Sequence, residues 1–360
     1  MTEQDSATHS ASIAVAPTSV RSGTLLAGLG VVAFSLTFPS TVWGLESFGP
    51  WSLVTLRSLL AALIAGGVLL AGRVPVPDRR HWSGLAVVAG GVVLGFPLLT
   101  SLALQTSTSS HAAVVVGLLP LTTAVFSSLR TGTRPPRPFW IAALAGAAVV
   151  IVFTVQQSGG ALSVSDLYLF GALLVCAAGY TEGGRLARVM PGWQVIGWAL
   201  ILAAPPMVAG AAVALCFEPV RPTVHGIIGL VWVAAGSAFV GLYVWYRGMA
   251  AIGVPRASQL QLAQPLLTLV WSFLLLGEKV SAAAPVAALA VLVCIAATQR
   301  AGARRSPAGA RAHRVIDLST RTATREEVTP DGGTPGRPAA DARQDRGPAR
   351  QGRRDRRSAR

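Results

Sequence analysis

The sequence has little charge and little cysteine. Only 12% of its 360 residues are charged while 52% are hydrophobic, a balance too apolar for an ordinary soluble domain. Its three cysteines, Cys176, Cys216 and Cys294, lie inside apolar segments at unrelated spacings. Neither a disulfide framework nor a cysteine metal site is therefore predicted. The sequence also has no phosphate-binding loop, so we expect no cofactor and no nucleotide as energy source.

Signals of catalysis are scarce as well. The histidines His81, His111 and His225 fall near loop ends, and neither an acid cluster nor a metal-ligand spacing accompanies them. Membrane enzymes gather such groups at the interface or in a wet cavity. We therefore predict that the protein is not an enzyme and has no catalytic or metal site.

Long apolar runs are what the sequence has in abundance. They recur from about residue 24 to residue 299, and each is long enough to cross the hydrocarbon core of a bilayer. We predict an all-α integral membrane protein, surrounded by lipid, with ten transmembrane helices. The predicted spans are 24–45, 50–72, 82–104, 110–130, 139–156, 167–187, 193–217, 226–247, 256–277 and 280–299.

The basic residues of the loops alternate with the spans. Loops after the even-numbered spans carry ten arginines, whereas those after odd-numbered spans carry only Arg221 and Lys279. Positive loops stay in the cytoplasm, so both termini are predicted to be cytoplasmic in a multi-pass protein of the cell (inner) membrane. Five spans per half then insert the halves in opposite orientation. We expect two inverted five-helix repeats, residues 23–157 and 166–299, around a central cavity.

Two apolar segments with a central proline echo each other. Pro120 and Pro265 lie 145 residues apart, and the same offset carries Thr123 onto Thr268 and Ser127 onto Ser272. Interrupted segments at corresponding positions of two halves point to the binding site of a transporter. At about 1.5 Å per residue, both prolines lie roughly 14 Å deep from opposite surfaces. We expect these two kinks to meet near the midplane.

The segments LALQTSTSSHAAVVVGLLPLTTAVFSSL and GMAAIGVPRASQLQLAQPLLTLVWSFLLLGEKVS resemble the EamA-like family of the drug/metabolite transporter (DMT) superfamily. The resemblance covers roughly residues 24 to 299, and Arg57 early in the second span is also similar. It implies alternating-access transport of a small organic solute, often export, through a cavity shared by the repeats. It implies no particular solute.

The ninth span carries a polar stripe of Ser258, Gln261, Gln264, Thr268 and Ser272 at helical spacing. Unpaired amides are costly in lipid, so this stripe is predicted to face the cavity, with Gln261, Gln264 and Thr268 as substrate ligands. Hydrogen bonds between helices are the alternative.

The fourth span offers Thr122 and Thr123 as further ligands, although such hydroxyls also bond back to their own helix. Aromatic residues on spans that the resemblance assigns to the cavity are candidates for stacking on solute, with packing or lipid contact as the alternative. They are Phe34, Phe96, Tyr180, Tyr243 and Tyr246.

Two charged residues lie within predicted spans. Glu182 is the one acid clearly inside a span, which makes it a candidate for proton coupling or for pairing with a cationic solute. An ion pair with Arg185, three residues on, is the alternative. Arg57 is a candidate for binding an anionic group, unless its side chain extends to the membrane surface.

The two ends of the chain differ from the spans. Residues 1–22 are predicted to be a disordered cytoplasmic segment, and residues 300–360 a disordered basic cytoplasmic tail. The tail holds sixteen arginines and seven acids, which is +9 of the total net charge of +15. We expect this charge to contact anionic lipid and expect no nucleic acid to bind, with a dedicated nucleic-acid or protein partner as the alternative.

Together with the family resemblance, the sequence predicts a secondary transporter of a small metabolite, such as an amino acid or an amphipathic drug-like compound. The resemblance makes export the expected direction. Protons are the candidate coupling ion. The alternative function is a membrane sensor or assembly protein that acts through the basic tail. The oligomeric state stays open, a homodimer included.

Overall fold

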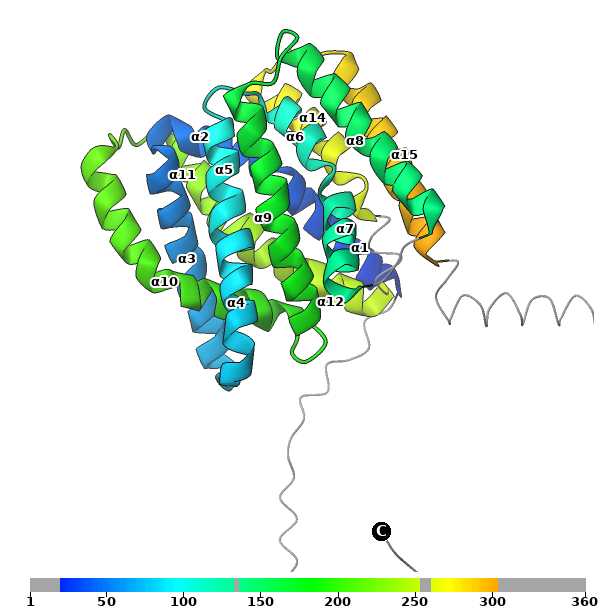
Figure 1. Ribbon diagram of the computed structural model, residues 1–360. Helices are drawn as coiled ribbons and strands as arrows, with labels where there is room; N and C mark the ends of the chain where they lie inside the picture. Colours follow the sequence, from blue (N-terminus) through cyan, green and yellow to red (C-terminus); the bar gives the residue numbers. More distant parts are fainter. Residues whose placement is uncertain (1–19, 133–135, 253–259, 304–360) are drawn as a thin grey trace, which may run out of the picture. The chain divides into compact units, whose positions relative to one another are not determined.

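The computed structural model describes residues 20–132, 136–252 and 260–303, and every regular element in these ranges is helical (Figure 1). Eight helical segments are long and apolar enough to cross a membrane, and two shorter apolar helices cover Gln264–Leu276 and Ala283–Ala297. An all-helical, multi-pass membrane protein is therefore confirmed. Most of the predicted tail and N-terminal segment lies outside the described residues.

Five predicted spans are single helices. They are α3 (Pro50–Ala71), α8 (Arg137–Gln157), α9 (Val164–Leu186), α10 (Gly192–Phe217) and α15 (Ala283–Ala303). Local residues explain where several begin. Pro50 opens α3, where a missing N–H costs nothing, and the Ser163 hydroxyl caps α9 by accepting from the Asp166 amide.

Four predicted spans are interrupted. The first consists of α1 (Val20–Ser35) and α2 (Thr37–Ser47), and the fourth of α6 (Ser109–Val116) and α7 (Leu119–Thr131). The third runs from η1 (Arg79–His81) through α4 (Trp82–Val88) and the π-helical segment η2 (Ala89–Gly95) to α5 (Phe96–Ala103). The eighth has a second π-helical segment, η3 (Trp232–Gly241), between α11 (Val224–Val231) and α12 (Leu242–Ile252). Segments of this kind often mark functional sites.

The ninth predicted span contains α14 (Gln264–Leu276), which ends at Gly277 in a left-handed conformation with φ 63°. Residues 253–259, and Ser258 with them, lie outside the described residues. Leu260 and Gln261 are helical, and a turn at Leu262 and Ala263 connects them to α14.

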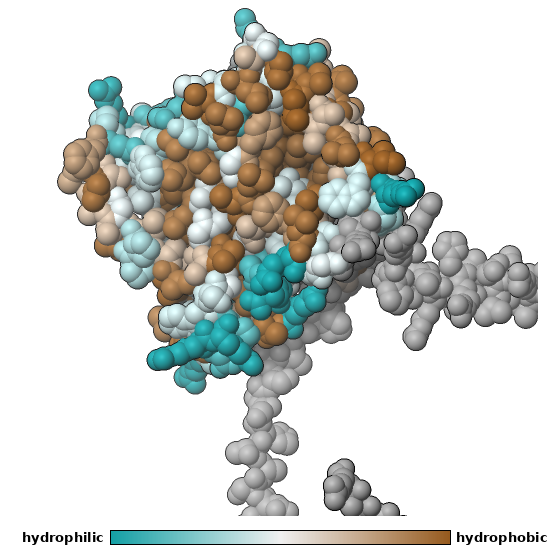
Figure 2. Space-filling model, viewed as in Figure 1, coloured by the Kyte–Doolittle hydropathy of each residue, from teal (hydrophilic) through white to brown (hydrophobic). Residues whose placement is uncertain are grey.

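The helices pack in specific pairs. α3 packs on α10, α8 on α15 and α6 on α14, while α1 and α2 lie along α12 and α11. α9 lies against α4, η2, α5 and α7 (Figure 1). The largest buried cluster joins α6, α8, α9 and α15 through residues such as Val115, Val150, Leu169 and Ile295. Large apolar side chains cover much of the outer face, as expected for contact with lipid (Figure 2).

Candidate functional site

The interruptions of the fourth and ninth predicted spans lie against each other. Gly117 and Leu118 separate α6 from α7, and Pro120 stands in the first turn of α7. Pro265 stands in the first turn of α14. A Cβ atom added to Gly117 would lie 3.6 Å from Cγ of Pro265. Both prolines therefore start new helices at one place in the bundle.

A cavity of about 220 Å³ opens at this meeting point. Its walls come from α2, α6, α7, α9, the segment before α14, α14 itself and α15. The lining residues are Phe38, Ala113, Val116, Gly117, Leu119, Pro120, Thr123, Tyr180, Gln261, Leu262, Gln264, Pro265, Thr268, Leu292 and Ile295. None of these described residues is charged, so the cavity is apolar with a few neutral polar groups.

Several of those polar groups have no hydrogen-bond partner among the described residues. The Thr123 hydroxyl oxygen is buried without a hydrogen bond to any described residue. The side-chain amides of Gln261 and Gln264 likewise bond to no side chain or backbone group among the described residues. The Thr123 oxygen is buried, where polar groups are normally paired, and the two glutamines are half-buried. These three groups are therefore available for a bound molecule or for water.

Thr268 has a different environment, although it also lines the cavity. Its hydroxyl lies 2.9 Å from the carbonyl oxygen of Ser35 and 3.0 Å from that of Gln264. Ser35 ends α1, so Thr268 satisfies a carbonyl at the interruption between α1 and α2. Trp271 Nε1 donates to the Ser35 hydroxyl oxygen at 2.9 Å, which ties α14 to the same point.

The other predicted ligand of α7, Thr122, does not line the cavity. Its hydroxyl donates back to the carbonyl oxygen of Leu118 at 3.1 Å. Tyr180 lines the cavity and is 43% exposed. Thr122 and Thr123 are thus neighbours in sequence with different surroundings.

Three of the other predicted aromatic residues, Phe34, Phe96 and Tyr243, do not line this cavity. Phe34 packs edge-on against Trp245, with ring centroids 6.2 Å apart, and Phe96 packs on Phe38, which is itself a lining residue. Tyr243 accepts a hydrogen bond from Arg247 at 3.4 Å. Tyr246 belongs to α12, but its side chain lies outside the described residues.

Glu182 lies between two arginines. Arg130 Nε of α7 lies 3.0 Å from Oε1, and Arg185 Nε of the same helix lies 2.6 Å from Oε2. The Glu182 side chain is 11% exposed, and Gly84 of α4 packs beside it. Both carboxylate oxygens are therefore occupied, and the pair ties α7 to α9. Arg57 is half-buried in α3 and has no ion-pair partner among the described residues.

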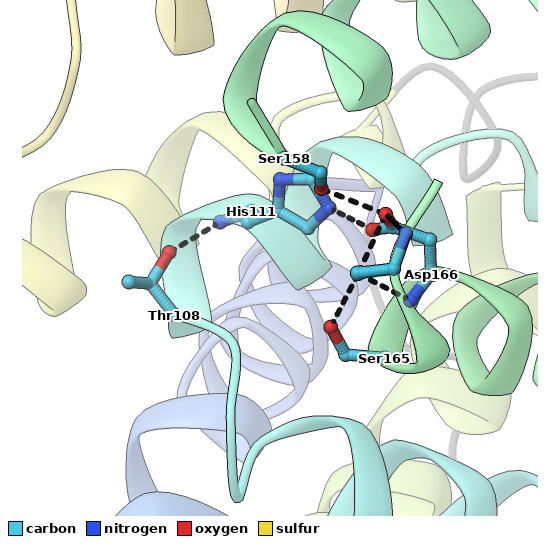
Figure 3. A network of polar contacts seen from close by, with 6 residues as sticks. Thr108, His111, Ser158, Ser165 and Asp166 are labelled. Atoms are coloured by element: carbon cyan, nitrogen blue, oxygen red, sulfur yellow. Dashed lines mark hydrogen bonds and ion pairs between the residues drawn. The ribbon is translucent and has the colours of Figure 1, made fainter. Parts of the chain in front are cut away.

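A second, more polar cavity of about 380 Å³ lies at the other end of α9. It is lined by the segments that follow α5, α8 and α14, which include Thr106, Ser107, Thr108, Ser110, His111, Gln157, Ser158, Ser163, Val164, Ser165, Lys279, Ser281 and Ala284. At its base, His111 Nε2 of α6 lies 2.7 Å from Oδ1 of Asp166 of α9 (Figure 3).

Asp166 is fully buried, and its other oxygen accepts hydrogen bonds. The hydroxyl groups of Ser158 and Ser163 each lie 2.7 Å from Oδ2, and the Ser163 amide lies 2.8 Å from it. The His111 ring stacks on Phe153, with centroids 5.4 Å apart. Sequence reasoning missed this pair, because residues 55 positions apart on two different spans share no local pattern.

Glu278 makes a further contact at the same end. Its carboxylate accepts from the backbone amides of Ser109 and Ser110 at 2.7 and 3.0 Å, and the Ser272 hydroxyl donates to Ser109 Oγ at 2.9 Å. An acid at a helix N-terminus satisfies free amides and complements the helix dipole. The start of α6 is thus held by acids from the second half of the chain, Glu278 and Asp166.

A bundle of apolar, membrane-length helices, with a small cavity where two interrupted helices meet, is the architecture of a membrane transporter. The EamA-like transporter family matches residues 21–155 and, a second time, residues 163–298. The chain belongs to this family, as the resemblance of its two proline-containing segments predicted.

Known proteins agree with this assignment. The chain is 42% identical over 275 residues to the "Uncharacterized transporter YdeK" of Bacillus subtilis (strain 168), which covers 76% of this chain and 95% of that protein. A solved crystal structure covers 79% of this chain and 99% of its own, with a TM-score of 0.56 and 22% identity. The latter similarity shows a shared fold. Family and relative both point to a transporter rather than an enzyme.

Proposed function

We propose that the protein is a secondary transporter of the cell membrane that exports a small organic solute by alternating access. The cavity of about 220 Å³ at the meeting point of α6, α7 and α14 carries the proposal. Interrupted helices of corresponding position in two halves bind solute in other transporter folds. Here the unpaired groups of Thr123, Gln261 and Gln264 lie at that point, where they can bond to a solute.

The composition of the cavity favours an uncharged or zwitterionic solute with apolar surface. A net charge inside a membrane needs an opposite charge nearby, and the described lining residues offer none. The volume is also below the roughly 300–1,000 Å³ typical of drug-binding pockets. A metabolite of amino-acid size fits these features better than a large amphipathic drug, and the neutral amides and hydroxyl would bond to its polar end.

The packing of the helices supports two inverted five-helix repeats as the framework of transport. In two five-helix repeats, the first span corresponds to the sixth and the third to the eighth. The first span (α1 and α2) packs on the eighth, and the sixth (α9) packs on the third in the same way. The contact of α7 (fourth span) with α9 (sixth span) likewise corresponds to the contact of α14 (ninth span) with α1 (first span). The two π-helical segments likewise occupy corresponding spans. This symmetry is the one required for two alternative closures around a single site.

Polar contacts hold helices together at both ends of the bundle. In the proposed orientation, Glu182 with Arg130 and Arg185 ties α7 to α9 near the cytoplasmic end. Glu278 and Asp166 hold α6 at the outer end. In this proposal Glu182 is a positioning residue that keeps two helices together, because both its oxygens are already paired.

Two measurements test the proposed function. Untargeted comparison of extracellular metabolites from cells with and without the protein should show one accumulating solute class. The purified protein in liposomes should then move that solute, and should move it less when Gln264 is replaced by leucine. No accumulating metabolite and no flux of any neutral or zwitterionic candidate would overturn the proposal. For orientation, in a background with the three native cysteines replaced by serine, Ser281→Cys should react with an impermeant maleimide added outside cells, and Arg188→Cys should not.

A further inference from the structure

We propose that His111 and Asp166 form a proton-binding site at the outer end of the bundle, and that a proton bound there holds this end closed. The inference rests on the proposed function in one respect, because the proposed orientation decides which end of the bundle is the outer one. The site itself is defined by the pair at the base of the polar cavity, at the junction of α6 and α9 (Figure 3).

The pair joins elements that must separate if this end opens. His111 belongs to α6 and Asp166 to α9, which are in different halves of the chain. Ser272 of α14 and Glu278, which follows α14, also form hydrogen bonds to the first residues of α6. Opening the cavity at this end therefore requires His111 to leave Asp166.

Burial makes the charge of the imidazole important. The Asp166 side chain is 0% exposed and that of His111 is 8% exposed. A buried carboxylate is costly unless it is paired and hydrogen-bonded. Two serine hydroxyls and one amide supply neutral donors to Oδ2, whereas His111 is the one titratable group among the described residues that contacts Oδ1.

Imidazole is the side chain that changes charge between about pH 5 and pH 8. Protonated His111 would form a charge-assisted hydrogen bond with the carboxylate, and such bonds are roughly twice as strong as neutral ones. The polar cavity supplies a path for the proton, because His111, Ser158 and Ser163 all line it. Acid outside the cell should therefore stabilise the closed outer end.

Other groups near His111 fit this assignment. Lys279 lines the same cavity, and Glu278 binds the amides at the start of α6. α8 presents the Phe153 ring and Gln157, and α15 presents Ala284. Glu46 of α2 lies 3.7 Å from His225 instead.

Hydrogen exchange of the intact protein in lipid nanodiscs tests the site without any solute. The peptide covering residues 104–118 should be about tenfold more protected at pH 5.5 than at pH 8, after correction for intrinsic exchange rates, because the charge-assisted bond is lost at the higher pH. His111→Gln, which retains a hydrogen-bond donor, should lose this dependence on pH. Asp166→Asn should lose it too, and serves as a second variant if the first does not fold.

Two control variants isolate the pair. His225→Gln removes an exposed histidine that also lies near an acid, and Glu278→Gln removes the other acid at α6. Both should retain the tenfold dependence. Equal protection of the wild type at both pH values, a dependence that survives in His111→Gln, or one that disappears in His225→Gln would overturn the proposal. Because no solute is present, these outcomes are independent of whether the protein transports.

Discussion

Pro265 lies directly against Gly117, at the point where α6 ends and α14 begins. The Cγ atom of Pro265 is 3.6 Å from the position of a Cβ at Gly117, and that Cβ would also lie 3.0 Å from the carbonyl oxygen of Val114. Two chain interruptions thus meet where one residue has no side chain. Gly117 and Pro265 also line the cavity of about 220 Å³.

A larger side chain at this contact should close the cavity. Gly117→Val is expected to reduce solute flux in proteoliposomes at least tenfold, since its methyl groups need the space of Pro265 and of the solute. Gly28→Val is the matched control, because a Cβ at Gly28 meets nothing within 4 Å. Flux of Gly117→Val equal to that of Gly28→Val would contradict the placement of the site.

Adjacent threonines allow a sharp test of the ligand groups. Thr123→Val removes the unpaired hydroxyl from the cavity and should raise the KM for the solute roughly two- to tenfold, as expected for one lost hydrogen bond of about 0.5–1.5 kcal/mol. Thr122→Val removes only a bond to the Leu118 carbonyl and should leave KM unchanged. A larger KM effect at Thr122 than at Thr123 would reverse their assignment.

The ion pairs of Glu182 predict a loss of stability. Glu182→Gln leaves Arg130 and Arg185 without a carboxylate, and the pair is partly solvent-exposed on the arginine side, so we expect a loss of about 1–3 kcal/mol and a lower Tm. The exposed pair of Asp78 and Arg80 supplies the control, since Asp78→Asn should not shift Tm measurably. The pH dependence of flux should be the same in Glu182→Gln as in the wild type. Its disappearance would make Glu182 the coupling residue.

The two prolines should affect transport more than folding. Pro120→Ala and Pro265→Ala let the preceding segments continue as helix, which would change the shape of the cavity at little cost to packing. We expect reduced flux with nearly unchanged Tm. Pro97→Ala at the start of α5, which does not line the cavity, is the control. Flux equal to wild type in both test variants would make the prolines simple packing features.

Much of the cavity was predictable because its signals are local. Pro120 and Pro265 interrupt helices through their own ring and missing N–H, whatever surrounds them. Gln261 and Gln264 are conspicuous in an apolar segment because lipid cannot pair an amide. The interruptions at Leu36 and in η2 and η3 were not predicted. Pro39 and Pro97 stand in the first helical turn after the first two, whereas η3 contains no proline.

The sequence by itself determined the apolar spans, the alternation of basic loops and the two proline interruptions, because each depends on a run of neighbouring residues. The tertiary structure decided which polar groups are paired. Thr268 bonds to Ser35, Glu182 to Arg130, and His111 to Asp166, each across tens to hundreds of positions in the chain. Such pairs depend on which helix faces pack together, and local hydropathy carries no information on that choice.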